Sequence, residues 1–304
     1  MNFGDLGKRI NATRKLWFFF SVRRAERKLS IQNLYRILWL HAFVRAALRG
    51  IPAAVPLPAG LGAAKSVRAV RGWRMKRYLN QVLEYLPERL AEPKWIDRCQ
   101  IEGLDSVLRA QRNGRPVVLA FSHFSAYRLS RFWLRTAGIP AATLMAGEAK
   151  NRREWERLGD GFSPFPEIPT VFYLDQLREA NGSLAAGNPL LVAIDHAAGK
   201  QMQVPVGEGW TFQMATGVVR LAIRHRAELI PCVVIDEGHW RFQLKLGRPV
   251  PAEYLTAESD WLHAGKHLLN EMLPHFRNHP DQCLDFIKNF QPAPPATPDG
   301  KSSG

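Results

Sequence analysis

The pattern of apolar and polar residues changes about one third of the way along the chain. Beyond residue 100, short continuously apolar runs alternate with segments that have an apolar residue every three or four positions, which predicts buried strands alternating with helices. The predicted strands are residues 116–122, 141–146, 189–194 and 229–235, followed by an alternating edge strand at 240–246. The predicted helices are residues 124–137, 174–186, 213–225 and 260–276. This order predicts an α/β fold with a mostly parallel central sheet flanked by helices on both faces.

The first third of the chain predicts helices instead. Residues 34–48 are strongly apolar, and His41, Arg45 and Arg49 recur there every four positions, which places them on one basic stripe of a helix. Residues 65–86 predict a second basic helix. A basic amphipathic region of this kind fits a helix lying in the membrane interface and attracted to anionic lipids. The alternative is a helix packed on the rest of the protein with its basic stripe in solvent.

Charge divides the chain at the same place. The 304 residues carry a net charge of +15. Residues 1–100 hold 20 Lys and Arg against 6 Asp and Glu, a difference of +14, and the rest hold 22 against 21. The excess charge predicts an anionic partner for the first third. No apolar run reaches the roughly 20 residues that a spanning helix needs, and no cleavable signal peptide is expected.

We therefore divide the chain into three parts. Residues 1–98 are predicted to form a basic amphipathic helical region that associates with membranes, and residues 99–290 are predicted to form the α/β domain. Residues 291–304 are rich in Pro, Ala, Gly and Ser and are predicted to be a disordered tail.

Other features of the sequence argue against several protein classes. Three cysteines without a CxxC pair argue against a disulfide framework and against a structural zinc site, so no metal site is expected. They favour a reducing compartment. The positive charge would permit nucleic-acid binding, but it lies among Leu, Trp and Phe residues without a zinc-ligand or RNP-like motif, so no nucleic-acid partner is expected. No G-x-S-x-G follows a predicted strand, which argues against a serine hydrolase of the α/β class.

Ionisable side chains follow two of the predicted buried strands. His123 and Ser125 come after the strand at 116–122, and Asp195, His196 and Lys200 come after the strand at 189–194. Ligands of open α/β sheets bind beyond the carboxyl ends of strands, and a histidine there can act as a general base. Structural roles remain as alternatives, because a histidine can cap a helix and an aspartate is common in turns.

A series of short blocks in chain order carries a resemblance to a known family. The blocks are residues 79–80, 86–89, 117–123, 195–199, 204–207, 214–217, 220–222, 230–231, 270–271, 280–282 and 286–290. Over roughly residues 79–290 the sequence resembles the lysophospholipid acyltransferase superfamily, in particular its bacterial lipid A lauroyl/myristoyl acyltransferase-like branch. The blocks between 195 and 231 are the most specific part of this resemblance.

The resemblance implies a membrane-associated O-acyltransferase. Such an enzyme moves a fatty acyl chain from a thioester of acyl carrier protein or CoA to a hydroxyl of a lipid or glycolipid, with His123 as general base. Backbone N–H groups at the start of the helix from Phe124 would stabilise the oxyanion. The implied partners are anionic membrane lipids, acyl carrier protein and the lipid acceptor. No metal or bound cofactor is implied, because the acyl-ACP or acyl-CoA is a co-substrate, and the implied location is the cytoplasmic face of the inner (plasma) membrane.

One residue departs from the motif of that family. The family has His-x4-Asp/Glu, and here the acid position holds Arg128. A nearby cation disfavours a protonated imidazole, so Arg128 cannot replace the acid. Either another carboxylate, Asp195 or Glu148, orients His123, or His123 works without an acid, or the protein is an inactive homologue that binds lipid or acyl carrier protein. We take His123 and Asp195 as the catalytic candidates. The substrate-binding candidates are Arg128, Ser125, His196, Lys200 and Glu148; a phosphate is the expected ligand of Arg128.

Overall fold

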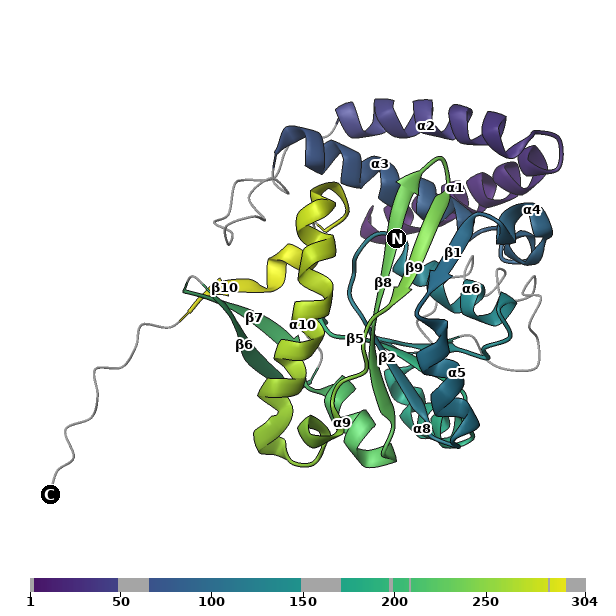
Figure 1. Cartoon of the computed structure of the whole chain (residues 1–304). Coiled ribbons are helices and arrows are strands. Elements are labelled where there is room, and N and C mark those ends of the chain that lie inside the picture. The colour runs from purple at the N-terminus through teal and green to yellow at the C-terminus, as the bar shows by residue number, and fades with distance from the viewer. Residues whose placement is uncertain are drawn as a thin grey trace, which may run out of the picture.

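The computed structural model describes residues 3–48, 66–148, 171–196, 199–207, 209–283 and 285–293, with side chains from residue 13 onward. These residues form an α/β fold in which helices cover both faces of a central sheet (Figure 1). The α-helices are α1 (Phe3–Glu26), α2 (Ile31–Ala47), α3 (Val67–Leu83), α4 (Pro93–Ile96), α5 (Leu104–Arg112), α6 (Ser130–Thr136), α8 (Leu177–Ala185), α9 (Gly217–His225) and α10 (Trp261–Asn278). The strands are β1 (Cys99–Glu102), β2 (Val117–Phe121), β3 (Ala142–Met145), β4 (Val171–Tyr173), β5 (Leu190–Ala193), β6 (Gln201–Gly207), β7 (Trp210–Ala215), β8 (Glu228–Gly238), β9 (Arg241–Leu246) and β10 (Phe290–Pro292).

The main sheet has seven strands in the order β1-β9-β8-β2-β5-β3-β4. The five strands from β8 to β4 are parallel to one another, and β9 and β1 run in the opposite direction. A second sheet is antiparallel, with the order β10-β7-β6. The predicted mostly parallel α/β fold is therefore confirmed.

Side chains of the central strand β2 alternate between two hydrophobic cores. Val118 and Ala120 face the core that contains α8, α9, α10 and the small sheet. Val117, Leu119 and Phe121 face the core that contains residues of α1 to α6. All five β2 side chains are buried, as expected for a strand with both faces covered, and this explains why its sequence is continuously apolar.

Helix α2 packs on α3 along a narrow stripe and leaves large apolar side chains exposed. Its buried residues, Leu34, Leu38, Ala42 and Ala46, recur every four positions. On other sides of the helix Leu40 is 60% exposed and Leu48 is 83% exposed. No helix of the described segments is long and apolar enough to cross a membrane.

The predicted basic stripe of this helix lies along α3. The guanidinium of Arg45 lies over the Tyr78 ring, 5.5 Å from its centroid, and the His41 ring is 5.2 Å from that of Tyr78. Arg49 lies outside the described residues.

Several predicted elements differ from the structure. The helix expected at residues 213–225 begins at Gly217, because residues 210–215 pair with β6 as the strand β7. The strand expected at the sheet edge, residues 240–246, is β9, which lies between β8 and β1, so that β1 is the edge strand. The helix expected at residues 124–137 is a 3-10 turn at Tyr127–Leu129 followed by α6.

A further difference concerns the tail expected at residues 291–304. Gln291 and Pro292 belong to β10 and pair with Thr211 and Trp210 of β7. A tail rich in proline can still supply a short edge strand, because an edge strand leaves half of its N–H groups unpaired. Residues 294–304 lie outside the described residues.

Candidate active site

The register of β2 and β5 brings His123 and Asp195 together. Phe121 is the register partner of Ala193 in this parallel pair. His123 and Asp195 each follow these partners by two residues, so both emerge at the carboxyl edge of the sheet, where ligands of open α/β sheets bind.

Asp195 forms two hydrogen bonds with His123. Its Oδ1 lies 2.8 Å from Nδ1 of the imidazole, and its Oδ2 accepts the backbone N–H of His123 at 2.7 Å. The Asp195 side chain has no exposed surface, whereas the His123 side chain is 27% exposed. The carboxylate therefore fixes the ring with Nδ1–H as the donor and leaves Nε2 for a substrate. This arrangement lets the ring accept a proton at Nε2 while the buried carboxylate stabilises the imidazolium.

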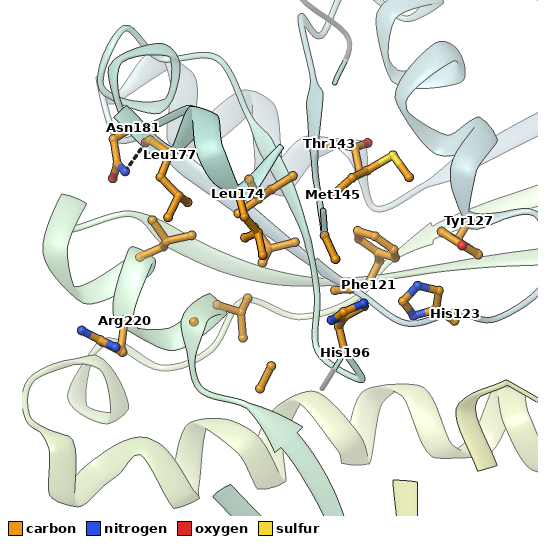
Figure 2. Close-up of a pocket in the computed structure, with 18 of the residues that line it drawn as sticks. Phe121, His123, Tyr127, Thr143, Met145, Leu174, Leu177, Asn181, His196 and Arg220 are labelled. Carbon is orange, nitrogen blue, oxygen red and sulfur yellow. Dashed lines mark hydrogen bonds between the residues drawn. The ribbon is translucent and has the colours of Figure 1, made fainter. Parts of the chain in front are cut away.

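His123 lines two cavities of different character. The first, which we name the apolar pocket, has a volume of about 560 Å³. Its apolar lining includes Phe121, Leu144, Leu174, Leu177, Val192, Val218 and Leu221. Figure 2 shows His123 and Tyr127 at one end of this pocket, Arg220 at the other and Leu174 between them.

The second cavity, the polar cleft, has a volume of about 110 Å³ and lies between His123 and helix α3. Its charged lining residues are Lys76, Arg77, Glu84, Arg128, Asp281 and Asp285. Lys76 pairs with Asp281 at 2.7 Å and Arg77 pairs with Asp285 at 2.8 Å. The imidazole thus stands where a mainly apolar ligand on one side and a polar ligand on the other can both reach it.

Arg128 is neutralised by a carboxylate of another helix. Its Nη1 lies 3.3 Å from Oε2 of Glu84, the residue that follows α3, and its Nε donates to the Tyr127 hydroxyl at 3.0 Å. Burial raises the pKa of Tyr127, opposed by the Arg128 charge, so the hydroxyl stays protonated and accepts this bond. Arg128 lines both cavities. In this chain the carboxylate that contacts His123 is therefore Asp195, while the motif's acid position holds Arg128, which pairs with Glu84.

The backbone N–H groups expected to stabilise an oxyanion are already bonded within the protein. Phe124 N–H donates to the Ser122 carbonyl at 2.7 Å, and Ser125 N–H donates to the Gln282 carbonyl at 3.1 Å. Ser125 has a φ of +52°, which interrupts the helix expected from Phe124. That expectation is wrong, because this loop bonds to a distant segment instead of starting a helix. The Ser125 side chain lines the polar cleft, and its buried Oγ has no hydrogen-bond partner among the described residues.

The other substrate-binding candidates lie at different distances from the pair. The His196 ring lies 5.9 Å from that of His123, centroid to centroid, and lines the apolar pocket. Burial, reinforced by the nearby His123, lowers the pKa of His196, which favours its neutral form. Lys200 forms an ion pair with Glu258, lies over the Trp261 ring and lines neither cavity. Glu148 is exposed, follows β3 and also lines neither cavity, so Asp195 is the carboxylate beside His123.

Sequence reasoning did not identify several residues of the site. Glu84 and Tyr127 contact Arg128, and Arg220 and Arg224 line the apolar pocket. The spacing of Arg220 and Arg224 is the one signal that was available, because residues four apart share a helix face. Among the described residues no group of His, Cys, Asp and Glu side chains could hold a metal ion.

The fold and the site together define an α/β protein with a His–Asp pair at the carboxyl edge of its parallel strands. Residues 82–290 match the family of bacterial lipid A biosynthesis acyltransferases, and this range includes His123 and Asp195. The match covers well over half of the 304 residues, and the chain belongs to this family. A comparison with curated proteins found no match. The resemblance identified from the sequence is confirmed, and the protein is an acyltransferase of this kind.

Proposed function

We propose that this protein is a membrane-associated O-acyltransferase that transfers a fatty acyl chain from an acyl thioester to a hydroxyl of a lipid or glycolipid. The observation that carries the proposal is the imidazole of His123, held by buried Asp195 and open to a cavity on each side. The mainly apolar pocket suits the donor, and the polar cleft suits the hydroxyl-bearing headgroup of the acceptor.

In the proposed reaction Nε2 of His123 takes the proton of the acceptor hydroxyl while its oxygen attacks the thioester carbonyl carbon. The C–S bond of the tetrahedral intermediate then breaks, an ester forms, and the thiolate receives the proton from the imidazolium. Asp195 stabilises the imidazolium through Nδ1–H. Arg128 is the cation that lines both cavities and is placed to contact the charged parts of a substrate.

Exposed apolar side chains on α1 and α2 support the association with a membrane surface. Trp17 is 73% exposed, Phe20 54%, Ile37 57% and Leu40 60%. Arg14, Arg24 and Arg36 are exposed on the same helices, within a region whose net charge is +14. Large exposed apolar residues beside basic ones favour the interface of an anionic membrane, which we propose is the cytoplasmic face of the inner membrane.

The proposal is tested with purified protein, an acyl-carrier-protein thioester carrying a labelled acyl chain, and a membrane extract as the source of acceptor. We expect a labelled lipid product that is lost in His123→Ala. His263→Ala is the matched control, because His263 is an exposed histidine of α10 that lines neither cavity. Thermal unfolding of both variants verifies that they fold.

The outcomes separate acyl transfer from binding alone. Transfer that persists in His123→Ala would show that His123 is not the base. A wild-type protein that binds the acyl-carrier thioester without transferring its chain would support the alternative, a homologue that only binds. An arginine at the motif's acid position favours that alternative, but His123 has a carboxylate partner in Asp195, and Arg128 is paired with Glu84.

A further inference from the structure

Two arginines of α9 line the apolar pocket, and Arg220 lies at the end opposite His123 (Figure 2). Arg220 and Arg224 are exposed, are four residues apart and both line this pocket. Positions four apart on a helix share a face and lie about 6 Å apart along its axis. Figure 2 shows Arg220 at the end of the cavity opposite His123, and Arg224, one helical turn further on α9, adds a second positive charge to the same lining.

These guanidinium groups have no carboxylate partner among the described residues. Arg23, Arg115 and Arg248 each form an ion pair with a glutamate, whereas no ion pair or side-chain hydrogen bond joins Arg220 or Arg224 to a described residue. The pocket lining contains Arg128 as well, and the described residues contribute no Asp or Glu to it. Like charges four apart on a helix repel each other, so a bound anion would stabilise this pair.

The rest of the pocket lining is largely apolar but includes one buried hydroxyl. Thr143 is 4% exposed, lines the pocket, and has an Oγ1 without a hydrogen-bond partner among the described residues. A buried hydroxyl without a partner is unfavourable, which makes it a hydrogen-bonding position for a ligand. A fitting ligand has a reactive group at one end, a slender arm with a few polar groups, and an anion at the other end.

We propose that Arg220 and Arg224 bind the phosphate of a phosphopantetheine arm whose acyl thioester reaches His123. This inference rests on the proposed function. The arm joins a thioester to a phosphate through a chain with two amides, so it matches all three features of the pocket. The planar forks of two arginines suit phosphate oxygens.

The position of α9 in the fold supports a donor that is carried by a soluble partner. In Figure 1, α9 lies at the bottom of the molecule and α2, with its exposed apolar residues, lies at the top. A donor that enters beside α9 would therefore approach from the side away from the proposed membrane surface. The same phosphate chemistry occurs in acyl carrier protein and in CoA, and the experiment distinguishes these two sources.

The test compares the double variant Arg220→Ala/Arg224→Ala with the wild type on three donors: acyl carrier protein, CoA and pantetheine without phosphate, all with the same acyl chain. We expect KM for the donor to rise about tenfold or more for the phosphate-bearing donors, the effect of losing charge-assisted hydrogen bonds, with kcat retained. KM for acyl-pantetheine should stay unchanged. The donor with the larger KM change is the source that the site serves.

The matched control is Arg109→Ala/Arg112→Ala, which also removes two positive charges from one helix. Arg109 and Arg112 are exposed on α5 and do not line the pocket. We expect this variant to keep the wild-type KM for every donor. An equal rise in KM in both double variants would indicate a general effect of net charge and would overturn the assignment.

A binding measurement separates this inference from the proposed function. Calorimetry on His123→Ala protein should show tighter binding of 4′-phosphopantetheine than of pantetheine. This difference in affinity should vanish when Arg220 and Arg224 are also replaced. Equal binding of the two compounds, or a change of acyl-chain-length preference in place of the KM effect, would refute the phosphate site. Transfer that survives His123→Ala would refute the proposed function, whatever the arginine variants do.

Discussion

Replacing Asp195 by asparagine tests the part of the site on which the mechanism depends most. In Asp195→Asn the side-chain amide oxygen would still accept the His123 backbone N–H, but the amide N–H groups would face Nδ1 of the imidazole. The proton of the neutral ring would then move to Nε2, the atom that must act as base. The variant keeps the size of the side chain and removes both the charge and the required tautomer.

The magnitude follows from the geometry. Asp195 is fully buried and its Oδ1 lies 2.8 Å from Nδ1, so we take the charge centres as about 4 Å apart. At an effective dielectric constant of about 20, an imidazolium and a carboxylate at that separation attract each other by about 4 kcal/mol. Since about 1.36 kcal/mol corresponds to a tenfold change in rate, kcat should fall roughly a thousandfold.

Single-turnover transfer of a labelled acyl chain measures this change without interference from product release. The KM for the donor should stay within about threefold, because Asp195 contacts the base and lines neither cavity. A kcat within about tenfold of the wild type would refute the reasoning, since roughly 3 kcal/mol of the expected effect would then be missing. A normal unfolding transition of Asp195→Asn serves as the control for folding.

Three further predictions concern the surroundings of the site. Arg128→Ala should raise the substrate KM, because it removes the cation that lines both cavities, and should destabilise the protein by about 1–3 kcal/mol in denaturant unfolding, because Glu84 loses its partner. Adding Glu84→Gln should restore the stability but leave the KM raised. Leu40→Asp should weaken sedimentation with anionic vesicles at least about tenfold, whereas Leu262→Asp on α10 should not. Burial raises the pKa of Asp236 above 3.8, so native stability should fall as pH rises through that raised pKa. Asp236→Asn should remove this slope and gain stability relative to the wild type at neutral pH, as measured by denaturant unfolding at several pH values.

The parts of the fold that could be predicted from the sequence are those whose pattern reflects local burial. Strands β2 and β5 are continuously apolar because both of their faces are covered, and their predicted bounds agree with the structure to within one residue. The predicted helix at residues 213–225 includes the last three residues of β7, because Met214 and Ala215 fit a helical and an alternating period equally well over so short a run. The pairing of β7 with β6 and β10 decides between the two, and pairing is not visible in the pattern.

The candidate site divides in the same way. His123 and Asp195 could be selected because both follow buried strands, and parallel strand ends meet at one sheet edge. The helix expected from Phe124 was wrong because the Ser125 N–H bonds to Gln282, a residue near the far end of the chain. A contact between distant segments of this kind leaves no trace in the local sequence, so no periodicity could reveal that the oxyanion donors are occupied.

The Arg128–Glu84 pair shows why a motif position should be interpreted through its contacts. In the sequence Arg128 stands where an acid is expected, and a cation beside a base would oppose protonation of the imidazole. In the fold the Glu84 carboxylate lies 3.3 Å from the Arg128 guanidinium, so the positive charge of Arg128 is balanced by an ion pair. Asp195, with its Oδ1 2.8 Å from Nδ1 of the imidazole, is the carboxylate that contacts the base. It can therefore stabilise the imidazolium that forms during proton transfer, which is the role that the motif acid would otherwise have.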